Sequence, residues 1–251
     1  TEFNETVGWE KGIVVEAFGQ GSVNDLRVKI MDSINEKVGA KKVPNMFTAY
    51  GDTAYTIDEL GLIVDIELYM TPNEIQEYVD AYIEEGRLGS DDKLKIFPIA
   101  KATEVMMVNK TDWDRFAKAT GASVEDLATW EGVSKIAKTY YEWSGKAFFG
   151  RDAMANYILI GAKQLGKEIV SVKEGQVTIN IDEDIMRKLW DNFYIPYING
   201  YYSSFGKFRT DDAKIGEIIA LVGSTTGAVY FPEKVTTVTG KSYDIELMVL
   251  P

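Results

Sequence analysis

Four short segments of the sequence combine glycine with hydroxyl, amide or charged side chains, and each of them could bind an oxygen-rich ligand. Backbone N–H groups and hydroxyls in such loops donate to oxygen, and an arginine adds a planar set of charged donors. Taken alone, each segment is more commonly a tight turn with an ordinary helix cap, whereas four such segments in one chain favour ligand contact. The segments are Gly19–Ser22, Tyr50–Thr53, Phe149–Asp152 and Gly223–Gly227.

Neither glycine-rich segment carries a complete nucleotide-binding signature. Gly19–Ser22 holds only two of the glycines that a dinucleotide fingerprint requires, and Gly223–Gly227 is not followed by Gly-Lys-Ser/Thr. The sequence therefore predicts no nucleotide cofactor, and its loops favour a small oxygen-rich ligand.

Arg151 and Asp152 are the most suggestive charged pair. The guanidinium could bind a carboxylate, a phosphate or vicinal hydroxyls, while Asp152 could accept from sugar hydroxyls or orient the arginine. A purely structural salt bridge is an equal alternative. A third possibility pairs Asp52 with Asp152 as the acid and base of a glycosidase, which requires the carboxyl groups to lie roughly 5 to 10 Å apart.

A run of aromatic residues near the C-terminal end could also contact a ligand. Residues 190–208 hold eight aromatic side chains, against 12% in the whole chain. Tyrosine and tryptophan rings pack on the apolar faces of sugars or on cations. We expect Phe193, Tyr194 and Tyr197 in the core, and Tyr201, Tyr202 and Phe205 are compatible with either core or ligand binding.

The composition excludes several kinds of chemistry. With no histidine and no cysteine, the chain can build neither a Ser-His-Asp triad nor a thiol or thiolate site. No acidic run matches a calcium loop, and no uncharged stretch is long enough to span a membrane. The 39 acidic residues against 27 basic ones give a charge of −12, which disfavours nucleic acid as a partner. We expect no catalytic residue, metal or cofactor.

Strand and helix patterns alternate along the chain. Apolar β-branched runs predict strands at 12–18, 43–50, 94–99, 104–109, 176–181, 228–231 and 243–250. Helices are predicted from Ser22 to Gly39, from Thr71 to Gly86, and after caps at Thr111, Ser123, Thr129 and Asp182. This alternation favours an α/β fold with a mostly parallel sheet, in which loops that follow strands meet at one edge and form a ligand crevice.

Three stretches resemble the family 1 extracellular solute-binding proteins, the receptor subunits of ABC importers. They are Pro44–Tyr50 leading through Leu62–Asp65, the segment Phe97–Trp113, and Thr129–Glu131 at a helix start. Their order along the chain carries the resemblance. Asn45 and Val108 stand where the family more often has Asp and Tyr.

The resemblance implies a type 2 periplasmic-binding-protein-like fold of two α/β lobes joined by a crossover hinge. Residues 1–104 would form lobe I, without its first strand and C-terminal return, and residues 105–251 would form lobe II. Such a chain is expected to be truncated at both ends. Carried over by position, the ligand-binding residues would be Gln20, Ser22, Asp52 and Thr53 in one lobe, Thr103 and Glu104 at the hinge, and Arg151, Asp152, Tyr202, Ser224, Thr225 and Thr226 in the other.

The resemblance also implies a function. The protein would be a non-enzymatic, monomeric receptor, extracellular or periplasmic and lipid-anchored in its full-length form, that delivers a small solute to ABC permease subunits. Carbohydrate is the first expectation for the solute. A small oxyanion held by Ser22, Arg151 and Ser224–Thr226 is the alternative within this fold, and a carboxylate-dependent glycoside hydrolase is the alternative of another class.

Overall fold

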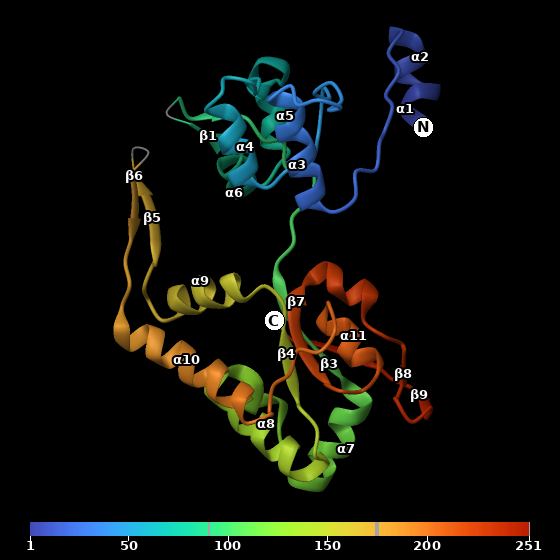
Figure 1. Cartoon of the computed structure of the whole chain (residues 1–251), viewed down its shortest axis with the longest axis vertical. Helices are drawn as coiled ribbons and strands as arrows, with labels where there is room; N and C mark the ends of the chain where they lie inside the picture. Colours follow the sequence, from blue (N-terminus) through green and yellow to red (C-terminus); the bar gives the residue numbers. More distant parts are fainter. Residues whose placement is uncertain (90, 174–175, 251) are drawn as a thin grey trace. The chain divides into compact units, whose positions relative to one another are not determined.

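The computed structural model describes residues 1–89, 91–173 and 176–250. The chain divides into two compact units, Thr1–Ile99 and Ala100–Pro251, and the fold is mixed α/β, as the sequence predicts (Figure 1). The boundary of the two lobes at residue 104 stays a prediction. Among the described helices, none has the length and apolar character needed to cross a bilayer.

The first unit is mainly helical. Ser22 and Asp25 cap α3 reciprocally, and Thr71 and Glu74 do the same for α5, as predicted. The elements are α1 (Glu2–Glu5), α2 (Val7–Lys11), α3 (Val23–Ile34), α4 (Gly51–Asp58), the 3₁₀ helix η1 (Ile66–Tyr69), α5 (Pro72–Gln76), α6 (Asp80–Glu85), β1 (Arg87–Leu88) and β2 (Lys93–Leu94).

Several predictions for this unit are wrong. No strand forms at 12–18 or 43–50, where Val14 is 75% and Phe18 is 66% exposed. A β-branched run becomes a strand only where a partner strand is available, and in the described chain no strand pairs with either segment. The strand predicted at 94–99 stops at Leu94, well before Pro98, which has no N–H for a ladder. The helices predicted at 22–39 and 71–86 are shorter or divided, since α3 ends at Ile34 and a break separates α5 from α6.

A four-stranded sheet organises the second unit. Its strands are β3 (Glu104–Asn109), β4 (Phe149–Arg151), β7 (Ala220–Ser224) and β10 (Leu247–Leu250), in the order β10-β3-β7-β4. Only β4 and β7 pair in parallel, while β3 is antiparallel to both of its neighbours, so the prediction of a mostly parallel sheet is wrong. Because β3 runs opposite to β4 and β7, the residues that precede β3 lie at the edge where β4 and β7 end.

Helices and small hairpins surround this sheet. They are α7 (Lys110–Thr120), the 3₁₀ helix η2 (Val124–Ala128), α8 (Trp130–Ser144), α9 (Met154–Gln164), β5 (Val170–Lys173), β6 (Gln176–Ile179), α10 (Glu183–Ile198), α11 (Arg209–Lys214), the 3₁₀ helix η3 (Thr225–Tyr230), β8 (Lys234–Thr236) and β9 (Ser242–Asp244). The strand at 104–109 and the caps Thr129 and Asp182 are confirmed. The side chain that caps α7 is that of Asn109 and not that of the predicted Thr111. Residues 228–230 form 3₁₀ helix where a strand is predicted, and the strand predicted at 243–250 is divided between two strands.

The core lies on both faces of the sheet because side chains of a strand alternate in direction. Met106 and Val222 belong to an aromatic cluster on one face, whereas Met107 and Leu221 belong to a second cluster on the other. The first cluster is built around Trp113, Phe116, Tyr140, Phe148, Phe149 and Tyr202, most of them in edge-to-face or tilted contact. This packing fixes β4 and β7, the strands that end at the candidate site.

Thr129 begins α8, and its loss should destabilise the second unit. Its hydroxyl oxygen accepts from the Gly132 N–H at 3.1 Å. We expect Thr129→Ala to lower the free energy of unfolding by about 1 kcal/mol in urea denaturation. Thr139→Ala is the control, because Thr139 is half-buried in the middle of the same helix and its hydroxyl donates to the Lys135 carbonyl instead of accepting from an N–H at the helix start. Equal losses in the two variants would contradict the capping role.

Candidate functional site

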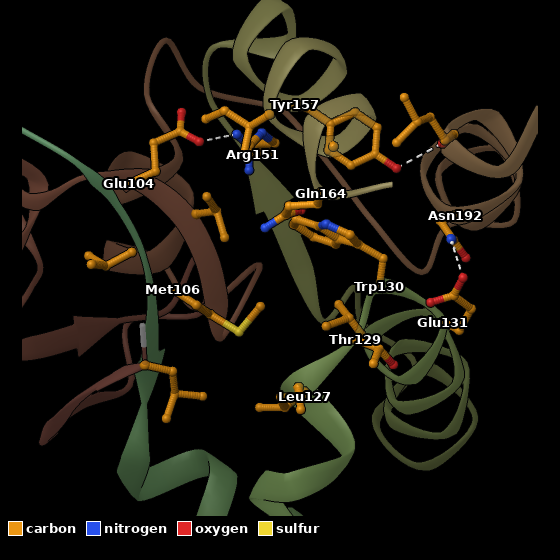
Figure 2. A pocket seen from close by; sticks show the side chains of 18 of the residues that line it. Glu104, Met106, Leu127, Thr129, Trp130, Glu131, Arg151, Tyr157, Gln164 and Asn192 are labelled. Atoms are coloured by element: carbon orange, nitrogen blue, oxygen red, sulfur yellow. Dashed lines mark hydrogen bonds and ion pairs between the residues drawn. The ribbon is translucent and has the colours of Figure 1, made fainter. Parts of the chain in front are cut away.

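A pocket of about 580 Å³ opens in the second unit where β4 ends and β3 begins. Figure 2 shows its side chains converging from β3, β4, α8, α9 and α10. The wall is largely apolar, with a few convergent polar groups, as is usual for small-molecule sites. Its polar lining residues are Thr103, Glu104, Thr129, Glu131, Arg151, Gln164 and Asn192, and its apolar ones include Met106, Leu127, Trp130, Tyr157, Leu189 and Val222.

Arg151 is the central charged residue of the pocket. It lies opposite Val222 in the β4–β7 register, so its side chain shares the face of the sheet that Met106 and Val222 line. Its side chain is only 2% exposed and forms an ion pair with Glu104. Asn156 Nδ2 donates to the other Glu104 oxygen at 3.0 Å. Each oxygen of the Glu104 carboxylate is therefore held by a different side chain.

One donor of this arginine is left without a partner. Arg151 Nε is buried and makes no hydrogen bond. Burial lowers the pKa of Arg151, and the charge of Glu104 opposes that effect. A guanidinium stays protonated at neutral pH regardless of such shifts. An unmade hydrogen bond of a buried donor is costly in free energy.

Two aromatic rings hold the guanidinium in place. Its central carbon lies 5.7 Å from the centre of the Trp130 ring and 5.5 Å from that of Tyr157. The two rings meet edge to face at 5.2 Å. Tyr157 donates its hydroxyl hydrogen to the Leu189 carbonyl at 2.8 Å, and burial raises the pKa of this phenol, so it stays a neutral donor.

Carboxylate and amide groups form the opposite side. Asn192 Nδ2 donates to Glu131 Oε1 at 3.1 Å, which joins α10 to the first turn of α8 (Figure 2). Gln164, in the last turn of α9, also lines the pocket. The pocket thus offers both hydrogen-bond donors and acceptors around an aromatic ring.

The hydroxyl loop after β7 lies beside this pocket. Ser224 is opposite Glu104 in the β3–β7 register, and its hydroxyl oxygen accepts from the Thr226 N–H at 3.2 Å. The Thr225 N–H donates to the Thr103 carbonyl at 2.8 Å. Thr103, Glu104, Arg151 and Ser224–Thr226 are therefore brought to one edge of the sheet, although only Thr103, Glu104 and Arg151 line the pocket.

Asp152 and Tyr202 do not join them. Successive residues of a strand point to opposite faces, so Asp152 points away from Arg151 and forms an ion pair with Arg209. The partner of Arg151 is Glu104, which corrects the interpretation that Asp152 orients it. Tyr202 is 1% exposed and packs on Phe149 in the core, where burial raises the pKa of its phenol.

The predicted residues of the first unit lie at two helix starts. Ser22 caps α3, while the Gln20 carbonyl accepts from Lys29 Nζ at 2.8 Å. Asp52 is exposed in the first turn of α4, and its neighbour Thr53 is buried and lines a narrow crevice against α3. Their role in binding stays a prediction. Asp52 and Asp152 belong to different units.

Sequence reasoning missed several pocket residues. Tyr157, Ile160, Gly161 and Gln164 follow the i, i+3, i+4, i+7 spacing of one helix face, which could have identified them once Arg151 was chosen. Trp130 and Glu131 belong to the Thr129–Glu131 segment, which is interpreted from the sequence only as a helix start. No cluster of residues that could hold a metal occurs in the described ranges.

Comparison with known proteins defines the class of this protein. Residues 1–243 match the family model described as bacterial extracellular solute-binding protein, and the chain belongs to that family. This confirms the resemblance stated from the sequence. No match to a curated protein is found.

A solved structure shows the same fold. UgpB from Mycobacterium tuberculosis, crystallised in complex with glycerophosphocholine, is similar to the whole chain with a TM-score of 0.75 at 14% identity. The similarity confirms the periplasmic-binding-protein-like fold. The chain spans 60% of the length of that protein.

Proposed function

We propose that this protein is a receptor of an ABC importer that binds a small carbohydrate reversibly and delivers it to membrane permease subunits. It would act outside the cytoplasm, periplasmic or extracellular, anchored by a lipid in its full-length form, and without catalysing a reaction on the solute. Family membership supports the receptor class, and the pocket around Arg151 supports the kind of solute.

The convergence of Arg151, Glu104, Glu131 and the Trp130 ring on one pocket is the observation that carries this proposal. A sugar hydroxyl can accept from the Arg151 guanidinium and donate to Glu104 or Glu131, and the half-buried Trp130 ring offers an apolar surface for the sugar face. Such groups bind and orient a neutral polyol.

The charges of the lining residues disfavour the oxyanion alternative. Two carboxylates, Glu104 and Glu131, line the pocket with one guanidinium, Arg151. An anion at Arg151 would lie beside Glu104, and two like charges 4 Å apart repel by about 4 kcal/mol at an effective dielectric constant of 20. A neutral solute avoids this cost.

Thermal-shift measurements with the wild-type chain test the solute class. The compounds are glucose, maltose and trehalose as neutral sugars, phosphate and sulfate as oxyanions, and choline as a cation. A ligand at 100 times its dissociation constant stabilises the fold by about 2.7 kcal/mol, which gives a measurable rise in melting temperature. We expect a rise with a sugar and no consumption of the compound. A rise with oxyanions alone would contradict the proposal, and turnover of a glycoside would support the hydrolase alternative.

Two tryptophan variants locate the binding. Trp130→Leu should remove most of the sugar-induced shift, because the indole lines the pocket. Trp190→Leu is the matched control, since Trp190 is exposed on α10 and stacks only on Tyr194 among the aromatic contacts. Loss of the shift in both variants, or in neither, would argue against binding at this pocket.

A further inference from the structure

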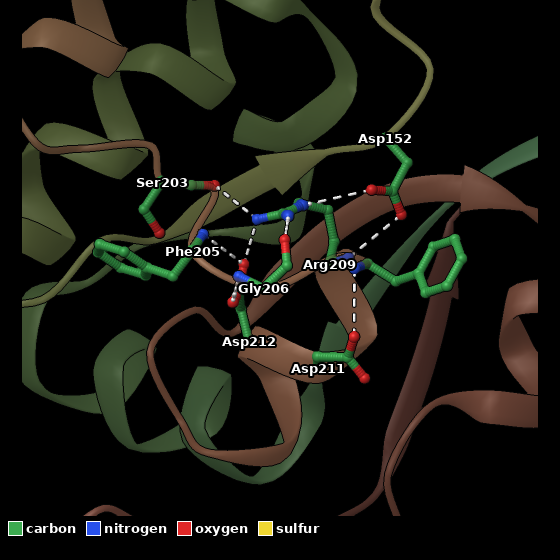
Figure 3. A network of polar contacts seen from close by, with 8 residues as sticks. Asp152, Ser203, Phe205, Gly206, Arg209, Asp211 and Asp212 are labelled. Carbon is green, nitrogen blue, oxygen red and sulfur yellow. Dashed lines mark hydrogen bonds and ion pairs between the residues drawn. The ribbon is translucent and has the colours of Figure 1, made fainter.

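A buried ion-pair network lies on the side of β4 opposite the pocket. Arg209 and Asp212, both in α11, have side chains that are 2% and 1% exposed and pair with each other. Figure 3 shows their contacts with Asp152 and with the loop around Gly206. Neither residue lines the pocket, so the proposed function does not use them.

The network holds the loop between Tyr202 and α11. Asp212 accepts from the Phe205 N–H at 3.2 Å and from the Gly206 N–H at 2.7 Å. Arg209 Nη2 donates to the Gly206 carbonyl at 2.6 Å. Both charges are therefore matched by hydrogen bonds in addition to their mutual attraction, which is what a buried pair requires.

The same arginine anchors the residue that follows β4. Its backbone N–H donates to Asp152 Oδ2 at 3.2 Å, and its Nε donates to Asp152 Oδ1 at 3.3 Å. The arginine stem reaches this place because Gly150 has no side chain. A Cβ on Gly150 would lie 2.8 Å from Arg209 Cδ and 2.7 Å from the Ser203 carbonyl oxygen.

Asp152 stands directly before a strained turn. Ala153 has a φ of 51°, in the left-handed region that alanine rarely adopts, and α9 starts with the next residue. Such a conformation persists only where the surrounding structure enforces it. Arg209 supplies that restraint on the Asp152 side of the turn. This turn also sets the direction of α9, which carries Tyr157 and Gln164 into the pocket.

We propose that Arg209 is a positioning residue of the pocket: by holding Asp152 it fixes the strained turn at Ala153, and with it the placement of Arg151 and of α9. The expected effect of Arg209 on sugar affinity rests on the proposed function. Its effect on the placement of Arg151 does not, because that placement is a property of the free protein.

NMR of the arginine Nε–H groups tests the geometry without a ligand. The Arg151 signal, assigned with Arg151→Lys, should be displaced by the ring currents of Trp130 and Tyr157, over which the guanidinium lies. In Asp152→Ala, which removes the anchor but keeps the Arg209–Asp212 pair, we expect this displacement to shrink by at least half. Asp152→Asn keeps one acceptor oxygen and should retain more of it.

A double variant separates positioning from folding. Arg209→Met with Asp212→Leu removes both buried charges together, which is tolerated far better than removing one. We expect the folded protein to show the altered Arg151 signal and about tenfold weaker sugar affinity. Lys146→Met is the control: Lys146 pairs with Glu217 just before the other end of β4, and its loss should leave the signal and the affinity unchanged.

The outcomes are distinguishable. An unchanged Arg151 signal in folded Asp152→Ala would overturn the positioning role whatever the solute is. The same change in Lys146→Met would also overturn it, because the effect would then follow any perturbation of β4. A changed signal in a protein that binds no sugar would support the positioning role and contradict the proposed function. If the double variant does not fold, the Asp152 variants decide.

Discussion

Arg151→Ala is expected to lower sugar affinity by at least tenfold and the free energy of unfolding by about 3 kcal/mol. The stability loss arises because Glu104, whose side chain is 17% exposed, loses the partner that compensates its charge. The affinity loss arises because the pocket loses its central charged donor. Isothermal calorimetry and urea denaturation measure the two effects.

Two further variants and a phosphate-binding measurement divide this result into its parts. Arg151→Lys keeps a positive charge but not the planar fork, so it should recover part of the stability and little of the affinity. Arg187→Ala is the control for losing an arginine, because Arg187 and its partner Glu183 are both exposed on α10, and such a surface pair is worth at most about 1 kcal/mol. If the wild-type chain binds phosphate and Arg151→Ala binds it equally well, this pocket does not bind the oxyanion.

Gly150→Ala is expected to destabilise the second unit by about 1 to 3 kcal/mol through overpacking. The added Cβ would lie 2.7 Å from the Ser203 carbonyl oxygen and 2.8 Å from Arg209 Cδ, so backbone as well as side chain must move. The displaced loop would weaken the restraint on Asp152, and sugar affinity should fall as well.

Gly223→Ala provides the matched control. It lies on the neighbouring strand β7, and a Cβ there would meet only Leu221 Cδ1 and Met107 Cε, both at 3.8 Å. This is ordinary van der Waals contact, so denaturation curves of the variant and the wild type should nearly coincide. Equal stability of Gly150→Ala and Gly223→Ala would contradict the close approach of Arg209 to β4.

Local signals in the sequence predict local structure well in this protein. The caps Ser22, Thr71, Thr129 and Asp182 each begin a helix, since a cap is a contact between residues three apart. The strand at 104–109 forms over its full predicted length, and it lies between two partner strands. The predicted strand at 12–18 has the same kind of apolar run but does not form, because pairing depends on distant residues.

At the candidate site, too, residue types are predictable from the sequence, whereas the contacts between distant residues are not. Residue types and spacing pointed to Arg151 and Ser224–Thr226, and the family resemblance added Thr103 and Glu104. It paired Arg151 with its neighbour Asp152, whereas the structure pairs it with Glu104, which lies 47 positions away along the chain. Adjacent strand residues face opposite ways, so the chain neighbour is the one residue least able to share the pocket.

The amino-acid sequence by itself determined the α/β class, the helix starts at Ser22, Thr71, Thr129 and Asp182, and the absence of histidine and cysteine chemistry, because each depends on residue type or short-range spacing. The order of its motifs along the chain carried the family resemblance. The tertiary structure alone decided strand direction, the burial of Tyr202 in the core, and which side chains meet around Arg151. These depend on contacts between residues far apart in the chain, whose free energy is set by packing and burial and not by local preference.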